Sequence, residues 1–195
     1  MQWGANAQGG ALNLPWPRSE AGAAGGIKVT HEGAGKPWLT VQSLAAIPLK
    51  ASFAAGYRIT RSVTFVEQKK KDAYTRGDVL RVKLEVDAAA DMTWVVVADP
   101  VPSGATILGS GLARDSTVAQ QGERKAGDAY PTYEERSFEA FRAYYEYAPK
   151  GKWSIEYTLR LNQDGEFSLP PTRVEAMYAP EMFGVVPNAR MKVLP

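Results

Sequence analysis

The sequence predicts an all-β protein built from antiparallel β-sandwiches, with at most one short helix. Three observations carry this prediction: apolar and polar residues alternate with a period of two, turn residues punctuate the alternating segments, and the strands recur at roughly 8–12-residue spacing. An apolar share of 45% and five tryptophans supply enough apolar surface for a packed core. The one candidate helix covers 104–113, where Gly104, Gly109 and Gly111 weaken it.

The strands are expected in two groups on either side of a seam near residues 50–56. Strands at 27–31 and 38–47 precede the seam. The segments that follow it are 57–67, 79–87, 93–100, 140–148 and 153–161. The segment 93–100 is a nearly continuous apolar run, which is typical of a strand buried on both faces. Residues 134–147 fit both helical and strand spacing, and their three closely spaced tyrosines favour a strand over 140–148.

Two connections are also readable. The segment 153–161 places apolar side chains at every second position, and Asn162–Gly165 follows as a turn. The residues EFSL then resemble a returning strand, so 153–169 is predicted to form a hairpin. Residues 109–132 are polar and glycine-rich and are expected to form a long surface loop.

Composition excludes several kinds of chemistry. Basic and acidic residues number 23 and 21, which gives no support for a nucleic-acid partner. There is no cysteine, and His31 is the sole histidine, so neither a disulfide nor a His-based zinc site is expected. The segment 33–37, GAGKP, lacks the full phosphate-loop pattern. Glu134 and Glu135 are adjacent, and adjacent residues on a strand point to opposite faces, so we expect a solvated edge with Arg136 and no acid/base pair. The sequence therefore predicts no cofactor, no metal and no enzyme.

Two segments stand out as candidate interaction sites. Residues 167–184 carry Pro170, Pro171 and Pro180, which argue against a long helix or a central strand. The same segment nevertheless carries large apolar side chains, including those of Met177 and Tyr178. The second segment is the basic run Lys69, Lys70 and Lys71 beside Asp72. A solvated turn is the expected structure of this run, and a docking patch is the alternative.

The spacing of residues along 145–184 resembles that of a known family. The pattern combines P-x-G-x-(W/Y), Y-x-L-R, G-x-F-x-(L/V)-P-P and (V/A)-E-x-M-Y-x-P. It is carried by Pro149, Gly151, Trp153, Tyr157, Leu159, Arg160, Gly165, Phe167, Leu169, Pro170, Pro171, Val174, Glu175, Met177, Tyr178 and Pro180. Together with DPVPSGATI at 99–107, these motifs are similar to the C-terminal region of bacterial alpha-2-macroglobulins. The resemblance is specific over about 57–190 and looser over the first 50 residues.

The resemblance implies a fold and a division into domains. Residues 1–55 would be returning strands of a CUB-like β-sandwich, and residues 56–195 a C-terminal macroglobulin-like sandwich of immunoglobulin-like type. The chain would then be the C-terminal region of a very large periplasmic protein, and a lipoprotein anchor in the inner membrane stays open. Family members inhibit proteases by trapping, through an internal Cys–Gln thioester. With no cysteine here, that thioester would lie upstream.

The resemblance also implies a role for the proline-rich segment. Met177 and Tyr178 match a loop that packs over the thioester of the neighbouring domain and excludes water, and Pro170, Pro171 and Pro180 would stiffen it. The alternative is that both side chains cap the core of their own sandwich. The implied partners are the thioester-type domain and, through the full-length protein, target proteases. A second function stays open, namely a docking module for envelope proteins in a thioester-less relative.

Overall fold

The computed structural model describes residues 30–35, 38–42, 44, 49–109 and 122–195, and the chain divides into two units between Ala45 and Ala46. The described residues of the first unit form no regular secondary structure. The strands expected at 27–31 and 38–47 are therefore wrong for the described residues of both segments, and their remaining residues lie outside the description. A strand needs a paired neighbour, and the described residues of this unit offer none. The CUB-like assignment of 1–55 stays a prediction.

The second unit is all-β in its described residues. Its strands are β1 (Phe53–Ala55), β2 (Tyr57–Glu67), β3 (Tyr74–Thr75), β4 (Val79–Ala88), β5 (Met92–Pro100), β6 (Ala105–Ile107), β7 (Lys125–Ala126), β8 (Tyr133–Arg136), β9 (Ala140–Ala148), β10 (Gly151–Leu161), β11 (Gly165–Phe167), β12 (Thr172–Ala176), β13 (Ala179–Val186) and β14 (Met191–Leu194). The strands predicted at 57–67, 79–87, 93–100, 140–148 and 153–161 are confirmed as β2, β4, β5, β9 and β10. The expectation that 93–100 is buried on both faces is wrong, because only alternate residues of β5 are buried and Thr93 and Trp94 are exposed. No helix able to cross a membrane occurs among the described residues.

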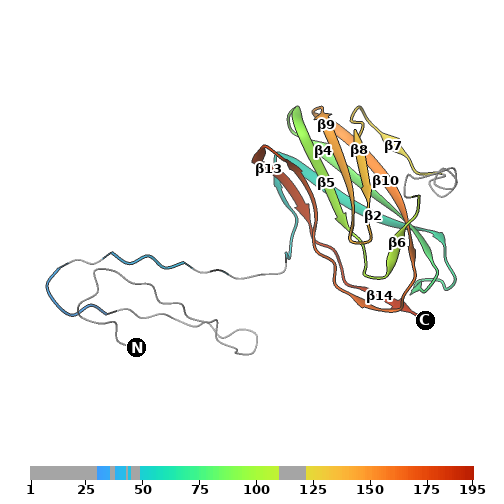
Figure 1. The fold of residues 1–195 in the computed structure, drawn as a ribbon, viewed down its shortest axis with the longest axis horizontal. Coiled ribbons are helices and arrows are strands. Elements are labelled where there is room, and N and C mark those ends of the chain that lie inside the picture. The colour runs from blue at the N-terminus through green and yellow to red at the C-terminus, as the bar shows by residue number, and fades with distance from the viewer. Residues whose placement is uncertain (1–29, 36–37, 43, 45–48, 110–121) are drawn as a thin grey trace. The chain divides into compact units, whose positions relative to one another are not determined.

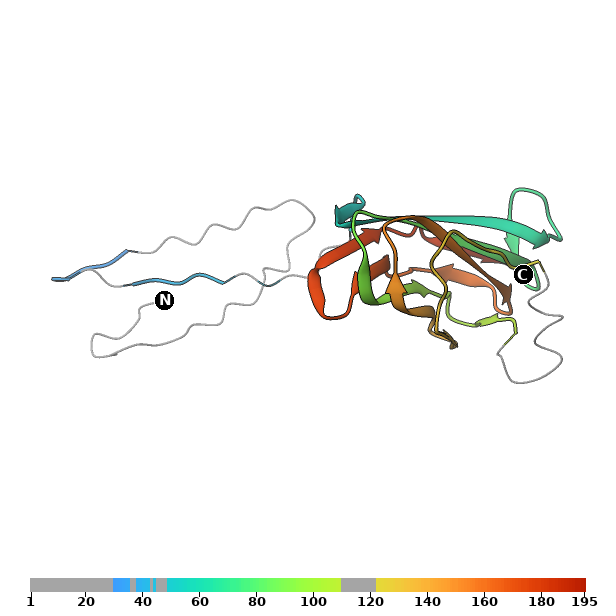
Figure 2. The ribbon, with the colours of Figure 1, turned by 90° about the horizontal axis from the view of Figure 1, so that it is seen from above.

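Three sheets account for the strands of this unit (Figure 1). The largest has the order β1-β13-β12-β5-β9-β8, and the second has the order β2-β4-β10-β6, with β7 also paired to β10. A small third sheet, β11-β14-β3, joins β14 and β3 in parallel. The two larger sheets form the layers of an antiparallel sandwich (Figure 2).

The core fills the space between the two larger sheets. On β4 the four alternate residues Leu80, Val82, Leu84 and Val86 are each at most 1% exposed. They face residues of the other layer, such as Val95, Val97 and Phe141. Burying each such side chain contributes about 1.5–3 kcal/mol. This alternating burial is why the period-two pattern was readable in the sequence.

One charged group lies inside this core. Asp99 on β5 is fully buried, and both its oxygens accept hydrogen bonds from Arg61 Nε at 2.9 Å. The hydroxyl of Tyr157 donates to it at 2.5 Å, and Thr172 Oγ1 donates to Asp99 Oδ1. Arg61 and Tyr157 belong to one sheet, and Asp99 and Thr172 to the other. Burial, followed by the charge of Asp99, raises the pKa of Tyr157 well above its usual range. The carboxylate therefore links the two layers.

The structure corrects two predicted connections. The hairpin predicted at 153–169 is wrong, because β11 pairs with β14. Both edges of β10 are already occupied, by β4 on one side and by β6 and β7 on the other. No helix occurs in the described part of 104–113. Ala105–Ile107 instead form β6 beside β10, with the alternate residues Ala105 and Ile107 buried.

The proline-rich segment also differs from expectation. Thr172–Ala176 is the central strand β12, paired with β13 on one side and β5 on the other. It can be central because Pro170 and Pro171 lie just before its first residue, where no ladder hydrogen bond is lost. Pro180 lies within β13, beside a shift of register between Glu175 and Ala176.

A second buried carboxylate, Asp78, lies just before the first residue of β4. Asp78 accepts hydrogen bonds from the Lys69 amide at 2.9 Å, from the Thr75 amide at 2.7 Å and from the Thr75 hydroxyl at 2.8 Å. Burial alone would raise the pKa of Asp78, but these donors outweigh it and hold the pKa below the usual value. The charged form is therefore the one that folding favours.

We expect Asp99→Asn to lower the free energy of unfolding by about 3–5 kcal/mol, because the change leaves Arg61 as an unpaired buried cation. Tyr157→Phe removes one hydrogen bond to a charged group and should cost about 1.5–3 kcal/mol. Urea unfolding measures both. The matched control is Asp164→Asn, whose carboxylate is exposed and 4.0 Å from Arg76; we expect a change under about 0.5 kcal/mol. Equal effects at positions 99 and 164 would contradict the structural role of Asp99.

We expect the stabilisation from Asp78 to depend on pH. Its folded pKa is depressed, so the stabilisation is complete above the unfolded pKa of about 3.9 and is lost as pH falls through the folded value. The difference in unfolding free energy between the wild type and Asp78→Asn should therefore be largest above about pH 4 and shrink below it. Urea unfolding at a series of pH values measures this. A difference that stays constant down to about pH 2 would rule the mechanism out.

Candidate functional site

The candidate site is the two-residue turn that joins β12 to β13. Met177 and Tyr178 form this turn, which follows the pair Ala176–Ala179. The next pair of the ladder is Glu175–Phe183, so Pro180, Glu181 and Met182 stand outside the regular register. The Met182 side chain occupies the space beside Gly56, where a Cβ atom would lie 2.2 Å from its Cε. The β13 side of the turn is thus irregular.

A residue of β5 holds the other side of the turn. The Met177 amide donates to the Trp94 carbonyl at 2.7 Å, which continues the β12–β5 ladder one step beyond Ala176–Val95. Trp94 has φ of +56°, a left-handed conformation that costs a non-glycine residue about 1–2 kcal/mol. Its ring meets the Tyr178 ring edge to face, with centroids 6.4 Å apart and planes at 88°.

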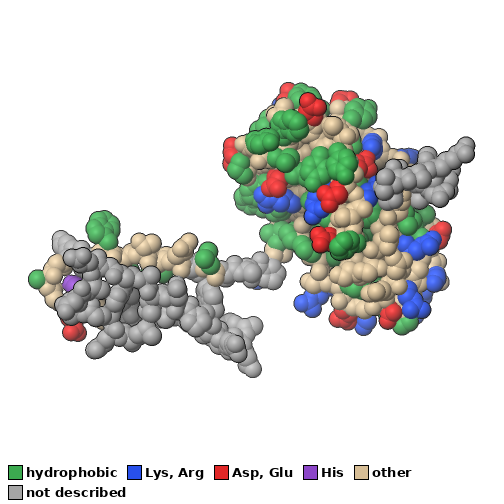
Figure 3. Space-filling view, viewed as in Figure 1, with side chains coloured by type: hydrophobic (Ala, Val, Ile, Leu, Met, Phe, Trp, Pro, Cys, Tyr) green, Lys and Arg blue, Asp and Glu red, His purple; other side chains and the backbone are tan. Residues whose placement is uncertain are grey.

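These three side chains form an exposed apolar patch, which we call the turn patch: Trp94, Met177 and Tyr178. Their exposed fractions are 49%, 48% and 79%. The interpretation in which Met177 and Tyr178 cap their own core does not fit these exposures. Figure 3 shows hydrophobic side chains gathered over the upper end of the sandwich, where β13 begins in Figure 1. A large apolar group that stays exposed on a fixed turn is typical of a contact surface.

The prolines of the segment lie in two separate places. Pro180 is two residues after Tyr178. Pro170 and Pro171 lie at the opposite end of β12, where they line a shallow hollow of about 290 Å³ with Pro100 and Arg142. The structure therefore brings only Pro180 close to the turn. Pro170 and Pro171 could stiffen the turn only through the length of β12.

The basic run Lys69–Lys71 lies at the other end of the sandwich. The turn patch is near the start of β5, which follows the end of β4, whereas Lys69 contacts Asp78 just before β4 begins. Strand β4 spans ten residues, so about 30 Å separates the two ends at roughly 3.3 Å per residue. Lys69 Nζ donates to the Arg76 carbonyl at 2.7 Å, which gives this lysine a structural contact within its loop.

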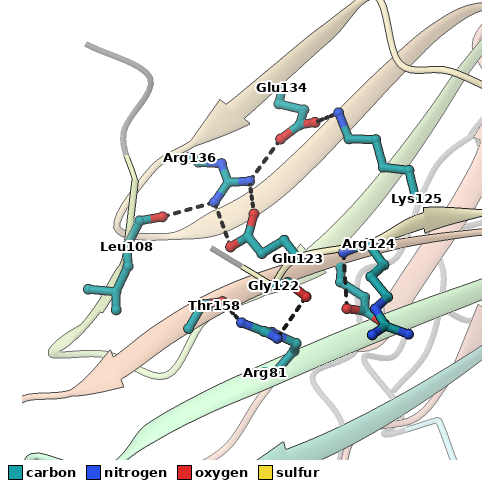
Figure 4. Close-up of polar contacts among 10 residues, drawn as sticks. Arg81, Leu108, Gly122, Glu123, Arg124, Lys125, Glu134, Arg136 and Thr158 are labelled. Atoms are coloured by element: carbon teal, nitrogen blue, oxygen red, sulfur yellow. Dashed lines mark hydrogen bonds and ion pairs between the residues drawn. The ribbon is translucent and has the colours of Figure 1, made fainter. Parts of the chain in front are cut away.

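Glu134 of β8 belongs to a structural cluster around Arg136 (Figure 4). Arg136, whose side chain is 5% exposed, contacts Glu123 at 2.7 Å and Glu134 at 2.9 Å and donates to the Leu108 carbonyl. Lys125 pairs with Glu134 at 2.5 Å. The solvated edge expected for Arg136 is therefore wrong. Its guanidinium is buried because Leu108 and Glu123, which flank 110–121 in sequence, both fold back onto β8.

Glu135 has different partners from Glu134. It pairs with Arg142 at 2.6 Å and accepts a hydrogen bond from the Tyr144 hydroxyl. The two carboxylates thus do not share one site, as expected from their alternation. Among the described residues, no group of three or more His, Cys, Asp or Glu side chains could hold a metal ion.

Sequence reasoning identified Met177 and Tyr178 but missed Trp94. A tryptophan at the start of a β-branched strand reads as an ordinary core or surface residue. Its left-handed backbone and its contact with a turn more than 80 positions later leave no local signal. Only the register of β5 against β12 brings the three residues together.

Comparison with known proteins adds the family of the chain. Residues 56–181 match the model of the bacterial alpha-2-macroglobulin MG10 domain. An alpha-2-macroglobulin homolog of Nostoc sp. is 28% identical over 153 residues, which cover 71% of this chain and 8% of that protein. The chain thus spans under a tenth of the length of this curated relative.

Three solved structures share the fold. The native Escherichia coli alpha-2-macroglobulin from domain MG7 to the C-terminus has a TM-score of 0.62 and 21% identity over 76% of this chain and 25% of that chain. The E. coli protein activated by porcine elastase has a TM-score of 0.63 and 21% identity over 74% of this chain and 14% of that chain. Salmonella alpha-2-macroglobulin reacted with methylamine has a TM-score of 0.59 and 21% identity over 74% of this chain and 10% of that chain. The family model matches well over half of the residues, and the chain belongs to the bacterial alpha-2-macroglobulin family, whose MG10 domain its sandwich represents.

Proposed function

We propose that this chain is the non-catalytic C-terminal region of a periplasmic, protease-trapping alpha-2-macroglobulin, and that its Met177–Tyr178 turn shields the thioester of a neighbouring domain. The observation that carries the proposal is the exposure of both side chains on a turn anchored from two strands. Family membership supports the wider role, and the Salmonella relative whose structure was obtained after reaction with methylamine supports an amine-reactive group in such proteins.

The physical argument concerns water and amines. An acyl–sulfur bond lasts only where nucleophiles are kept from its carbonyl carbon. A thioether and an aromatic ring exclude water without offering a strong nucleophile of their own. When methylamine reaches the site, its nitrogen bonds to the acyl carbon, the carbon–sulfur bond breaks, and the proton lost by the amine passes to the released thiolate.

The other partners follow from this arrangement. The turn contacts the thioester-type domain of the same chain, and target proteases meet the full-length protein. The periplasmic location is part of the same proposal. The docking alternative through Lys69, Lys70 and Lys71 has less support, because Lys69 already contacts its own loop through Asp78 and Arg76.

We expect the double change Met177→Ala and Tyr178→Ala in the full-length protein to speed consumption of the thioester by methylamine about tenfold or more. The reason is that water and amine gain access to the acyl carbon. Release of the free thiol, followed with a thiol reagent, measures the rate.

The matched control is Phe138→Ala. Phe138 is 77% exposed, much like Tyr178, but lies in the β8–β9 turn at the Pro100 end of the sheet. We expect no acceleration from it. A double variant that reacts at the wild-type rate would refute the shielding. So would a full-length sequence without the C-x-E-Q motif, and the docking module would then be the remaining function.

A further inference from the structure

Trp94 is the least expected residue in the turn patch. Its φ of +56° places a bulky side chain in a region that such residues rarely occupy. Strain of this kind persists only where surrounding contacts fix it, and it is concentrated at functional positions. Here the surrounding contacts are the ladders of β5: Thr93 pairs with Tyr147 and Val95 with Tyr145, while Trp94 between them is left out.

The turn depends on this residue because its own hairpin is irregular. On the β13 side, Pro180, Glu181 and Met182 fall outside the register. On the β5 side, the Trp94 carbonyl accepts the Met177 amide at 2.7 Å, within a regular ladder. The position of Met177 is therefore set by β5.

The ring of Trp94 fixes the second residue of the turn. Tyr178 is 79% exposed, and its one described ring contact is the edge-to-face contact with Trp94. Without that contact, the Tyr178 ring would be free to rotate on a two-residue turn. With it, both apolar side chains point out of the sandwich in a fixed arrangement.

We infer that Trp94 is the positioning residue of the turn patch: its backbone places Met177, and its ring holds Tyr178 in the orientation that covers the thioester. This inference rests on the proposed function. It adds a residue from another strand, and its two parts, carbonyl and ring, can be separated by substitution.

The separating variant is Trp94→Gly. Glycine adopts a φ of +56° without strain and keeps the carbonyl that Met177 needs, so the sheet is preserved while the ring is lost. Trp94→Phe keeps an aromatic ring beside Tyr178 and serves as the conservative variant. Tyr133→Ala is the matched control, because it removes the exposed partner of another aromatic contact in the same sheet, Tyr133 with the half-buried Tyr144, whose ring centroids are 5.9 Å apart.

The first measurement uses this chain with 3-fluorotyrosine placed at position 178. We expect a ¹⁹F signal shifted from that of free 3-fluorotyrosine. Trp94→Gly should move it to the free value, whereas Trp94→Phe and Tyr133→Ala should leave it in place. An unchanged signal in Trp94→Gly would overturn the inference, whatever the rates below show. Thermal unfolding of each variant checks that the sandwich is folded.

The second measurement uses the full-length protein and methylamine. We expect Trp94→Gly to react to within about threefold of the rate of Tyr178→Ala, while Trp94→Phe stays near the wild-type rate. If Met177→Ala with Tyr178→Ala accelerates the reaction and Trp94→Gly does not, the inference fails and the proposed function survives. If the double variant does not accelerate it, the proposed function fails together with the shielding part of the inference, and the ¹⁹F signal alone decides whether Trp94 positions the turn.

Discussion

The buried carboxylate of Asp99 is the constraint on which the arrangement of the sandwich depends. A charge in an apolar core is tolerated only when ion pairs and hydrogen bonds replace its water, and here Arg61, Tyr157 and Thr172 do so from three different strands. A slip of β5 by one residue would turn Asp99 to the outer face and leave Arg61 buried alone. The ion pair therefore reinforces the register of β5, which the burial of Val95 and Val97 on the same face also favours.

The position of the turn patch follows from that register. With Asp99, Val97 and Val95 facing inward, β12 pairs with β5 from Arg173–Ala98 to Ala176–Val95, and the next residue to be paired is Met177. Thr172, at the first position of β12, is itself a ligand of Asp99. The Asp99 carboxylate thus aligns β5 with β12, and Met177 follows Thr172 by five residues along β12. The turn is therefore placed by the regular pairing of β12 with β5, and the irregular β13 side contributes less.

The positions of strands could be predicted from the sequence because each depends on a local residue pattern. Alternation located β2, β4 and β10, an apolar run located β5, and β-favouring tyrosines located β9. Pairing was not local: β11 follows β10 in the chain, yet β10 has no free edge, and β11 joins β14 instead. The prediction that the prolines rule out a central strand was wrong, because Pro171 precedes β12 and Pro180 follows it, and neither lies within it. Met177 and Tyr178 were found through resemblance, whereas Trp94 was missed, since its role requires a backbone conformation and a register that no short motif carries.

Exposure alone does not single out the turn patch. Phe138, Tyr130 and Tyr133 are 77%, 68% and 62% exposed, so apolar groups are visible elsewhere on the sandwich. The turn patch differs from these other exposed residues because its side chains are already held in place before a partner binds. Met177 is held by a ladder hydrogen bond and Tyr178 by an aromatic neighbour, so little side-chain and loop entropy is left to lose when a partner covers them. A cover over a reactive bond must also stay in place between encounters, because any opening admits water. The turn meets that requirement because Trp94 of β5 holds it in place. A turn held only by the irregular β12–β13 hairpin would move away from the reactive bond more often.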